Sequence, residues 1–196
     1  MNTIVANMFL LPMGLGSGAL LYLSSYDGET LSPFTDNKTY EMEISVLLLI
    51  SFLYFAIDFW HMCKKYKPEN KIYFVHHMLG IISIPVVYFG YYNMVKYLLS
   101  YLTYELSTPF LSISSYFHHN KIINRFTKIV DIMFFIMFTI VRIVFGSFLL
   151  FQTAPIVYSL EAPTKYLAVF PFILQSMNYW WYIRIISMLS KKLKTN

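Results

Sequence analysis

The feature that most constrains this chain is a series of apolar stretches, each about 20 residues long, that recurs through all 196 residues. An α-helix rises about 1.5 Å per residue, so a stretch of this length suffices to cross the hydrocarbon core of a bilayer. The expected helices span residues 4–23, 44–61, 72–91, 94–117, 128–152 and 165–189. The sequence therefore predicts an all-α integral membrane bundle of about six transmembrane helices.

The composition agrees with a membrane bundle and argues against a sizeable soluble domain. Hydrophobic residues make up 57% of the chain and charged residues 13%, about half the usual share of a globular protein. A net charge of +5 would fit a nucleic-acid-binding protein, but the basic residues lie in short loops between apolar stretches. We therefore expect no nucleic-acid partner. The single cysteine, Cys63, excludes an internal disulfide and a CxxC metal motif.

The distribution of basic residues predicts the orientation in the membrane. Ten of the 15 Lys and Arg residues fall after the second and fourth expected helices and in the C-terminal tail: Lys64, Lys65, Lys67, Lys71, Lys121, Arg125, Lys128, Lys191, Lys192 and Lys194. Such residues gather in cytosolic loops. Both termini are therefore predicted to be cytosolic, and the Asn37-Lys-Thr39 sequon falls in a non-cytosolic loop.

Two adjacent histidines, His76 and His77, lie inside the third apolar stretch. Titratable side chains within a membrane segment are costly and by default mark a functional site. Neighbouring helical residues point about 100° apart, so we expect one ring to face the site and the other a neighbouring helix. The alternative is that both rings only pair with polar groups between packed helices.

Other polar residues collect in the predicted cytosolic half of the bilayer. They include Asp58, His61, Asp131 and Arg184, with Glu105, Arg142 and Asn178 deeper. Scattered structural residues would not gather in this way, although ion pairing between helices or snorkelling is the favoured role for the two arginines and Asp131. Pro109 has no N–H for the carbonyl of Glu105, so we expect the fourth helix to be weakened at this acid.

The histidine pattern does not favour a metal centre. Membrane di-iron enzymes need many histidines in HxxxH and HxxHH spacings, and neither spacing occurs among the five histidines. Zinc would need Asp58, His61, His76 and His77 to converge from two helices. No metal ligand is therefore assigned.

Three motifs in order resemble the TLC-domain family, which includes the ceramide synthases. They are residues 74–80 (FVHHMLG), residues 104–111 (YELSTPFL) and residues 130–135 (VDIMFF) followed by Arg142. Asp58 also resembles a family position. Residues 104 and 105 are Tyr-Glu where ceramide synthases have His-Asp, a form similar to the smaller TLC domain-containing members.

The resemblance implies a helical bundle around a lipid-sized cavity, with residues 40–191 as a TLC-like domain. We expect residues 1–39 to form the first helix and a non-cytosolic loop, and residues 192–196 to form a basic cytosolic tail. The resemblance further implies acyl transfer from acyl-CoA by His76 and His77, with Glu105 and Asp58 as orienting acids and Asp131 as support. The residues expected to contact substrate are His61, Ser107, Thr108, Arg142, Asn178 and Arg184.

Two functions remain open from the sequence. The first is an acyltransferase that acts on membrane lipids, with acyl-CoA as co-substrate and no cofactor. The second is a non-catalytic protein that binds, senses or traffics lipids. Either would reside in the endoplasmic reticulum or another internal membrane, and the sequence leaves its oligomeric state open.

Overall fold

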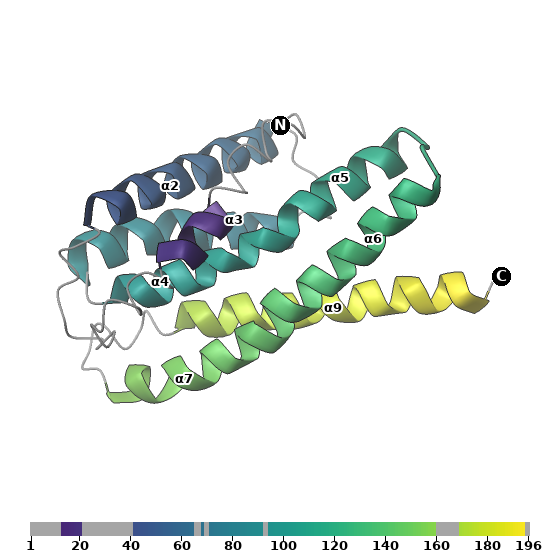
Figure 1. The fold of residues 1–196 in the computed structure, drawn as a ribbon. Helices are drawn as coiled ribbons and strands as arrows, with labels where there is room; N and C mark the ends of the chain where they lie inside the picture. The colour runs from purple at the N-terminus through teal and green to yellow at the C-terminus, as the bar shows by residue number, and fades with distance from the viewer. Residues whose placement is uncertain are drawn as a thin grey trace.

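The computed structural model describes residues 13–20, 41–64, 68, 71–91, 94–159 and 169–194. All the regular structure in these residues is helical, which confirms the all-α expectation (Figure 1). A short helix covers residues 13–20. It is followed by α2 (Glu41–Lys64), α3 (Lys71–Pro85), η2 (Val86–Gly90), α4 (Val95–Leu102), η4 (Thr103–Ser107), α5 (Thr108–His119), α6 (Arg125–Met137), η5 (Phe138–Phe145), α7 (Gly146–Ser159) and α9 (Val169–Lys194).

Several of these elements join end to end into longer helical segments, which we call rods. The second to sixth predicted stretches each lie on one rod (α2, α3 with η2, α4 to α5, α6 to α7, and α9), with residues 165–168 of the sixth outside the described part. The first expected helix, 4–23, is described only over residues 13–20. Helix α9 continues to Lys194, so the expected tail begins inside a helix, and residues 195–196 lie outside the described part.

Three helices in the described part are long and apolar enough to cross a membrane: Glu41–Lys64, Lys71–Gly90 and Arg125–Pro155. Large apolar side chains point outward from them, and Phe89 and Phe151 are 83% and 79% exposed. Water would not favour such a surface, whereas lipid tails would. The chain is therefore a membrane protein.

Two irregular turns interrupt the rods where polar residues are buried. Segment η4 is a 3-10 helix that carries Glu105, and Pro109 lies in the first turn of α5 directly after it. This confirms the interruption predicted from Pro109. Segment η5 is a π-helix that carries Arg142, and π-helical turns recur at functional sites.

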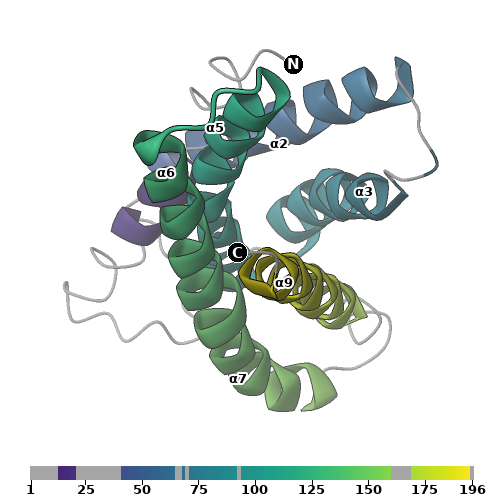
Figure 2. The same ribbon diagram turned by 90° about the vertical axis from the view of Figure 1, so that its right-hand side faces the viewer.

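The rods alternate in direction, so helix ends with basic residues meet at one end of the bundle. The turn between α5 and α6 and the C-terminal end of α9 lie at the same end (Figure 1). Helices α3 and α9 are neighbours, and α9 also packs against η5 and α7 (Figure 2). This arrangement brings α3, η4, η5 and α9 around one interior region.

Candidate functional site

His76 on α3 faces the acid on η4. Its Nε2 atom lies 3.3 Å from Oε1 of Glu105, and both side chains are nearly buried. Glu105 also accepts a hydrogen bond from Thr108, with 2.7 Å between Oγ1 and Oε2, and one from Arg142. A group that accepts from these donors is a carboxylate, so Nε2 of His76 is the ring nitrogen that carries the proton.

In the neutral ring, the other nitrogen of His76 then carries a lone pair. This Nδ1 atom is buried and has no hydrogen-bond partner among the described residues. A bare imidazole nitrogen can act as a nucleophile or a base, and a carboxylate on the opposite nitrogen orients the ring for that role.

Arg142 holds Glu105 in place from η5. Its Nη2 atom lies 3.4 Å from Oε1 of Glu105 and 2.9 Å from Oγ1 of Thr108. Its Nε atom donates to Oγ of Ser107 at 2.9 Å, and its Nη1 atom donates to Oδ1 of Asn178 at 3.3 Å. The guanidinium thus joins η4, α5 and α9 to η5, and each of its three nitrogens has a partner.

A second layer of hydrogen bonds fixes this arginine. The side-chain NH₂ of Gln175 donates to the carbonyl oxygen of Arg142 at 3.0 Å, and Oε1 of Gln175 accepts from the Tyr104 hydroxyl, also at 3.0 Å. Gly146 makes room for this contact, because a Cβ there would lie 2.5 Å from the hydroxyl of Tyr104 and 2.6 Å from Oε1 of Gln175.

The ring of His77 meets that of His76 edge-on, with 5.4 Å between centroids, and its Nε2 atom is directed toward α2. Its Nε2 atom lies 3.3 Å from Oδ2 of Asp58, and its ring packs edge-on against Phe55, with 5.5 Å between centroids. The side chain of His77 is 7% exposed. The structure therefore places the two adjacent histidines against different acids on different helices.

A cavity of about 480 Å³ with both polar and apolar lining residues lies between α3, η4, η5 and α9, and we call it the polar cavity because charged side chains line its inner part. It reaches toward the end of the bundle where α5 meets α6, because its outer lining comes from Ile72 at the start of α3 and Met188 near the end of α9. Its inner polar lining comprises His76, His77, Glu105, Ser107, Thr108 and Arg142. Such a space can hold a polar headgroup.

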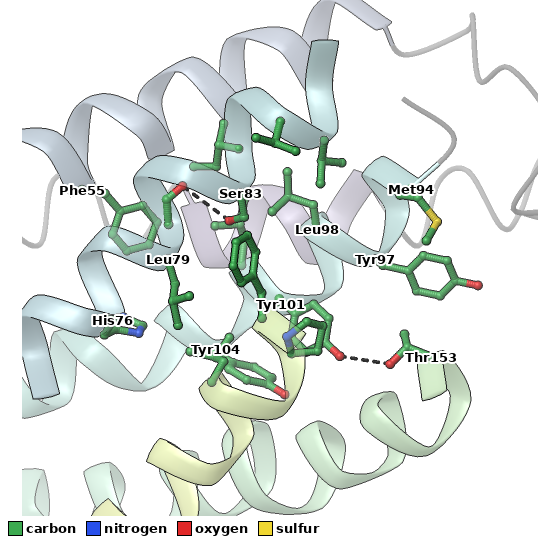
Figure 3. A pocket seen from close by; sticks show the side chains of 18 of the residues that line it. Phe55, His76, Leu79, Ser83, Met94, Tyr97, Leu98, Tyr101, Tyr104 and Thr153 are labelled. Atoms are coloured by element: carbon green, nitrogen blue, oxygen red, sulfur yellow. Dashed lines mark hydrogen bonds between the residues drawn. The ribbon is translucent and has the colours of Figure 1, made fainter. Parts of the chain in front are cut away.

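A second, apolar cavity of about 130 Å³ extends from His76 toward the opposite end of the bundle. Figure 3 shows His76 at one end and Met94, Tyr97 and Thr153 at the other. The hydroxyls of Tyr101 and Thr153 lie 3.2 Å apart across it. His76 and Glu105 line both cavities, so the His76 ring lies where a polar space meets an apolar one.

Asp131 lies apart from this site. Its carboxylate accepts from the hydroxyl of Ser114 at 2.6 Å and lies 3.0 Å from Nε2 of His118, a half-exposed residue near the end of α5. Neither cavity is lined by Asp131. The structure does not bring this residue, which we expected to support the histidines, into contact with them.

The other residues expected to contact substrate also differ in whether they line a cavity. Arg184 lines the polar cavity, and its guanidinium lies 4.0 Å from the ring centroid of Trp180. Asn178 is fully buried behind Arg142 and lines neither cavity. His61 is exposed near the end of α2 and also lines neither.

Three residues of the site were given no role in it from the sequence. Tyr104 and Gln175 support Arg142, and Trp181 lines the polar cavity with its ring 5.8 Å from that of His76. Tyrosine and tryptophan in apolar helices are most simply packing residues. Gln175 carried the stronger signal, as a polar residue one helical turn before Asn178.

In the described part of the chain, no group of three or more His, Cys, Asp or Glu side chains is arranged to hold a metal ion. His76 and His77 share no acid: the first meets Glu105 and the second Asp58. The geometry is that of two separate His–acid pairs.

Comparisons with known proteins identify the family of this chain. The family model of the TLC domain matches residues 2–187. A TLC domain-containing protein of Acanthamoeba polyphaga mimivirus is 43% identical over 188 residues, which cover 96% of this chain and 94% of that protein. The chain therefore belongs to the TLC domain family.

Proposed function

We propose that this chain transfers an acyl group from acyl-CoA to a membrane lipid, with His76 as the nucleophile. One observation carries the proposal: Nδ1 of His76 is bare, buried and located where an apolar cavity meets a polar one. An acyl thioester has the same division, with a long apolar chain on one side of its carbonyl group and a polar carrier on the other.

The reaction follows from this placement. The lone pair of His76 Nδ1 attacks the thioester carbonyl carbon, the C–S bond breaks, and the electron pair leaves with the CoA thiolate. Glu105, 3.3 Å from Nε2, balances the positive charge on the acylated ring and accepts its proton. A lipid amine or hydroxyl then attacks the acyl carbon, the bond between this carbon and Nδ1 breaks, and Glu105 returns its proton to Nε2 of His76. The proton of the amine or hydroxyl is taken up by the CoA thiolate, which leaves as the free thiol.

The two cavities have separate roles in this scheme. The apolar cavity takes the acyl chain, and burial of each methylene contributes about 0.8 kcal/mol. The polar cavity admits the CoA portion, and Arg184 at its lining supplies a positive charge for phosphate. This cavity faces the predicted cytosolic end, where acyl-CoA is dissolved, and we propose an internal membrane such as the endoplasmic reticulum as the location.

The second pair, His77 and Asp58, has a supporting role in the proposal. His77 packs its ring against Phe55 on α2, so the Asp58 contact joins α2 to α3 behind the reactive ring. Loss of the His77–Asp58 contact should loosen α3, the helix that carries His76, without removing the nucleophile.

A second candidate function is lipid binding without chemistry. The observation that favours it is the completeness of the arginine network: Arg142 makes contacts with Glu105, Thr108, Ser107 and Asn178 without any ligand. In this function, the network has a structural role alone: it builds a polar cavity for the headgroup of a lipid that the protein senses or carries.

Intact-mass spectrometry of the purified protein after incubation with acyl-CoAs separates the two functions. The wild-type protein should gain the mass of one acyl group, and neutral hydroxylamine should release it as a hydroxamate, even when the adduct is short-lived. The variant His76→Ala should gain no mass, whereas His77→Ala, the matched control from the neighbouring position, should still be acylated.

Two results would oppose the proposal. Acylation that persists in folded His76→Ala would exclude this ring as the nucleophile. Absence of both adduct and hydroxamate in folded wild-type protein that binds acyl lipids would leave the binding function as the better explanation.

A further inference from the structure

Trp181 on α9 contains a buried hydrogen-bond donor that the network around Arg142 does not use. Its indole Nε1 atom has no partner among the described residues. An indole nitrogen can only donate, and leaving a buried donor unpaired costs about 1–3 kcal/mol. Buried polar groups are nearly always paired, so this atom calls for an acceptor.

The ring of Trp181 is held in place beside His76. It stacks on Tyr73 with 5.3 Å between centroids and an interplanar angle of 30°, and it meets the His76 ring edge-on at 5.8 Å. The guanidinium carbon of Arg142 lies 6.0 Å from its centroid. Contacts with three side chains orient the indole within the lining of the polar cavity.

The unpaired atoms of the two neighbouring rings have opposite character. Nδ1 of His76 presents a lone pair, whereas Nε1 of Trp181 presents a proton. A carbonyl group satisfies both, because its carbon accepts the lone pair and its oxygen accepts the hydrogen bond. The guanidinium of Arg142 already donates to the protein through each of its nitrogens.

We propose that Nε1 of Trp181 donates a hydrogen bond to the carbonyl oxygen of the acyl group bound against His76. This inference rests on the proposed function and assigns a further catalytic residue to it. When His76 attacks, the carbonyl oxygen becomes an oxyanion, and the fixed indole donor binds this oxyanion more strongly than the ground-state carbonyl.

A pair of unreactive ligands tests the contact apart from the chemistry. In the first, the thioester is replaced by a 2-oxoalkyl thioether of CoA, which keeps the carbonyl but cannot expel the thiolate. In the second, an alkyl thioether of CoA has no carbonyl. Wild-type protein in nanodiscs should bind the ketone about tenfold more tightly, as expected for one well-formed hydrogen bond. Trp181→Phe, which keeps an aromatic ring, should bind both equally.

Trp60→Phe is the matched control for loss of an indole N–H. Trp60 is 60% exposed on α2 and lines neither cavity, so this variant should keep the full preference for the ketone. In acyl transfer, Trp181→Phe should lower the rate by about 10²-fold or more, whereas Trp60→Phe should leave it unchanged.

A spectroscopic measurement needs no variant of Trp181. The chain has three tryptophans, so ¹⁵N-indole labelling gives three side-chain N–H resonances. The ketone should shift one of them strongly to the position of a hydrogen-bonded donor, and the alkyl thioether should not.

The outcomes separate this inference from the proposed function. If folded Trp181→Phe keeps the tenfold ketone preference, or if the ketone shifts no indole resonance, the Trp181 contact is wrong even where acyl transfer occurs. If the ketone preference depends on Trp181 but no acyl transfer occurs, the carbonyl contact stands, and both the proposed reaction and the catalytic assignment of Trp181 are wrong.

Discussion

Glu105 on η4 and Arg142 on η5 form a buried ion pair, with 3.4 Å between Oε1 and Nη2 and side chains that are 4% and 6% exposed. The same Oε1 atom lies 3.3 Å from His76. One carboxylate oxygen therefore serves both the cation that fixes it and the ring that it orients. The stability that the pair provides can be separated from its effect on His76 by changing both residues.

We predict that Arg142→Met alone destabilises the protein by about 3–5 kcal/mol, because it leaves the Glu105 carboxylate buried without its cation. The double variant Glu105→Gln with Arg142→Met should recover most of this loss, since neither side chain is then charged. Thermal unfolding in detergent, followed by intrinsic fluorescence, measures the difference.

The same double variant should not recover acyl transfer. A glutamine amide cannot balance the charge that develops on the His76 ring, so the rate should stay at least about 10²-fold below wild type. Restored stability without restored activity would assign Glu105 to the chemistry. Activity that returned together with stability would instead mean that the pair is only structural.

Gly80 sets the spacing between α2 and α3, and this gives a second prediction. A Cβ at this position would lie 2.7–2.9 Å from three ring atoms of Phe55. Gly80→Ala should therefore destabilise the protein by about 1–3 kcal/mol, as overpacking does. Adding Phe55→Leu should restore part of this loss, because a smaller side chain leaves room for the methyl group.

Gly90→Ala is the control for the alanine substitution itself. An added Cβ at Gly90 meets no heavy atom within 4 Å, so the change in stability should stay within about 0.5 kcal/mol. Equal melting temperatures for Gly80→Ala and wild type would show that α2 and α3 can move slightly apart without loss of stability, and the steric argument would be wrong.

Apolar length and a few backbone rules sufficed to predict the fold from the sequence. Stretches of about 20 apolar residues located the rods, and the missing N–H of Pro109 located the interruption that carries Glu105. These signals are local: each depends on residues within one helix, and the rise per residue and the missing donor do not change with the packing around them.

The site depends on how helices align with one another, which local patterns do not specify. The 100° between neighbouring residues predicts that His76 and His77 diverge, but it does not say which acid each one meets. Asp131 lies on the same helical rod as Arg142, three turns away, and its position alone could not show that His118 and Ser114 would be its partners. Trp181 resembled a packing residue because only the structure reveals its unpaired nitrogen.

The length of the acyl chain should depend on the far end of the apolar cavity, where Met94 lies opposite His76 (Figure 3). Met94→Trp should fill this end and shift the preferred substrate to shorter chains, because each methylene that no longer fits loses about fourfold in affinity. Met94→Ala should shift the preference to longer chains. Competition among saturated acyl-CoAs of increasing length, read by hydroxamate release, measures both shifts.

Met78→Trp is the matched control, because Met78 is 47% exposed on α3 and lines neither cavity. A uniform loss across all chain lengths in Met94→Trp, or the same length profile as Met78→Trp, would place the acyl chain elsewhere.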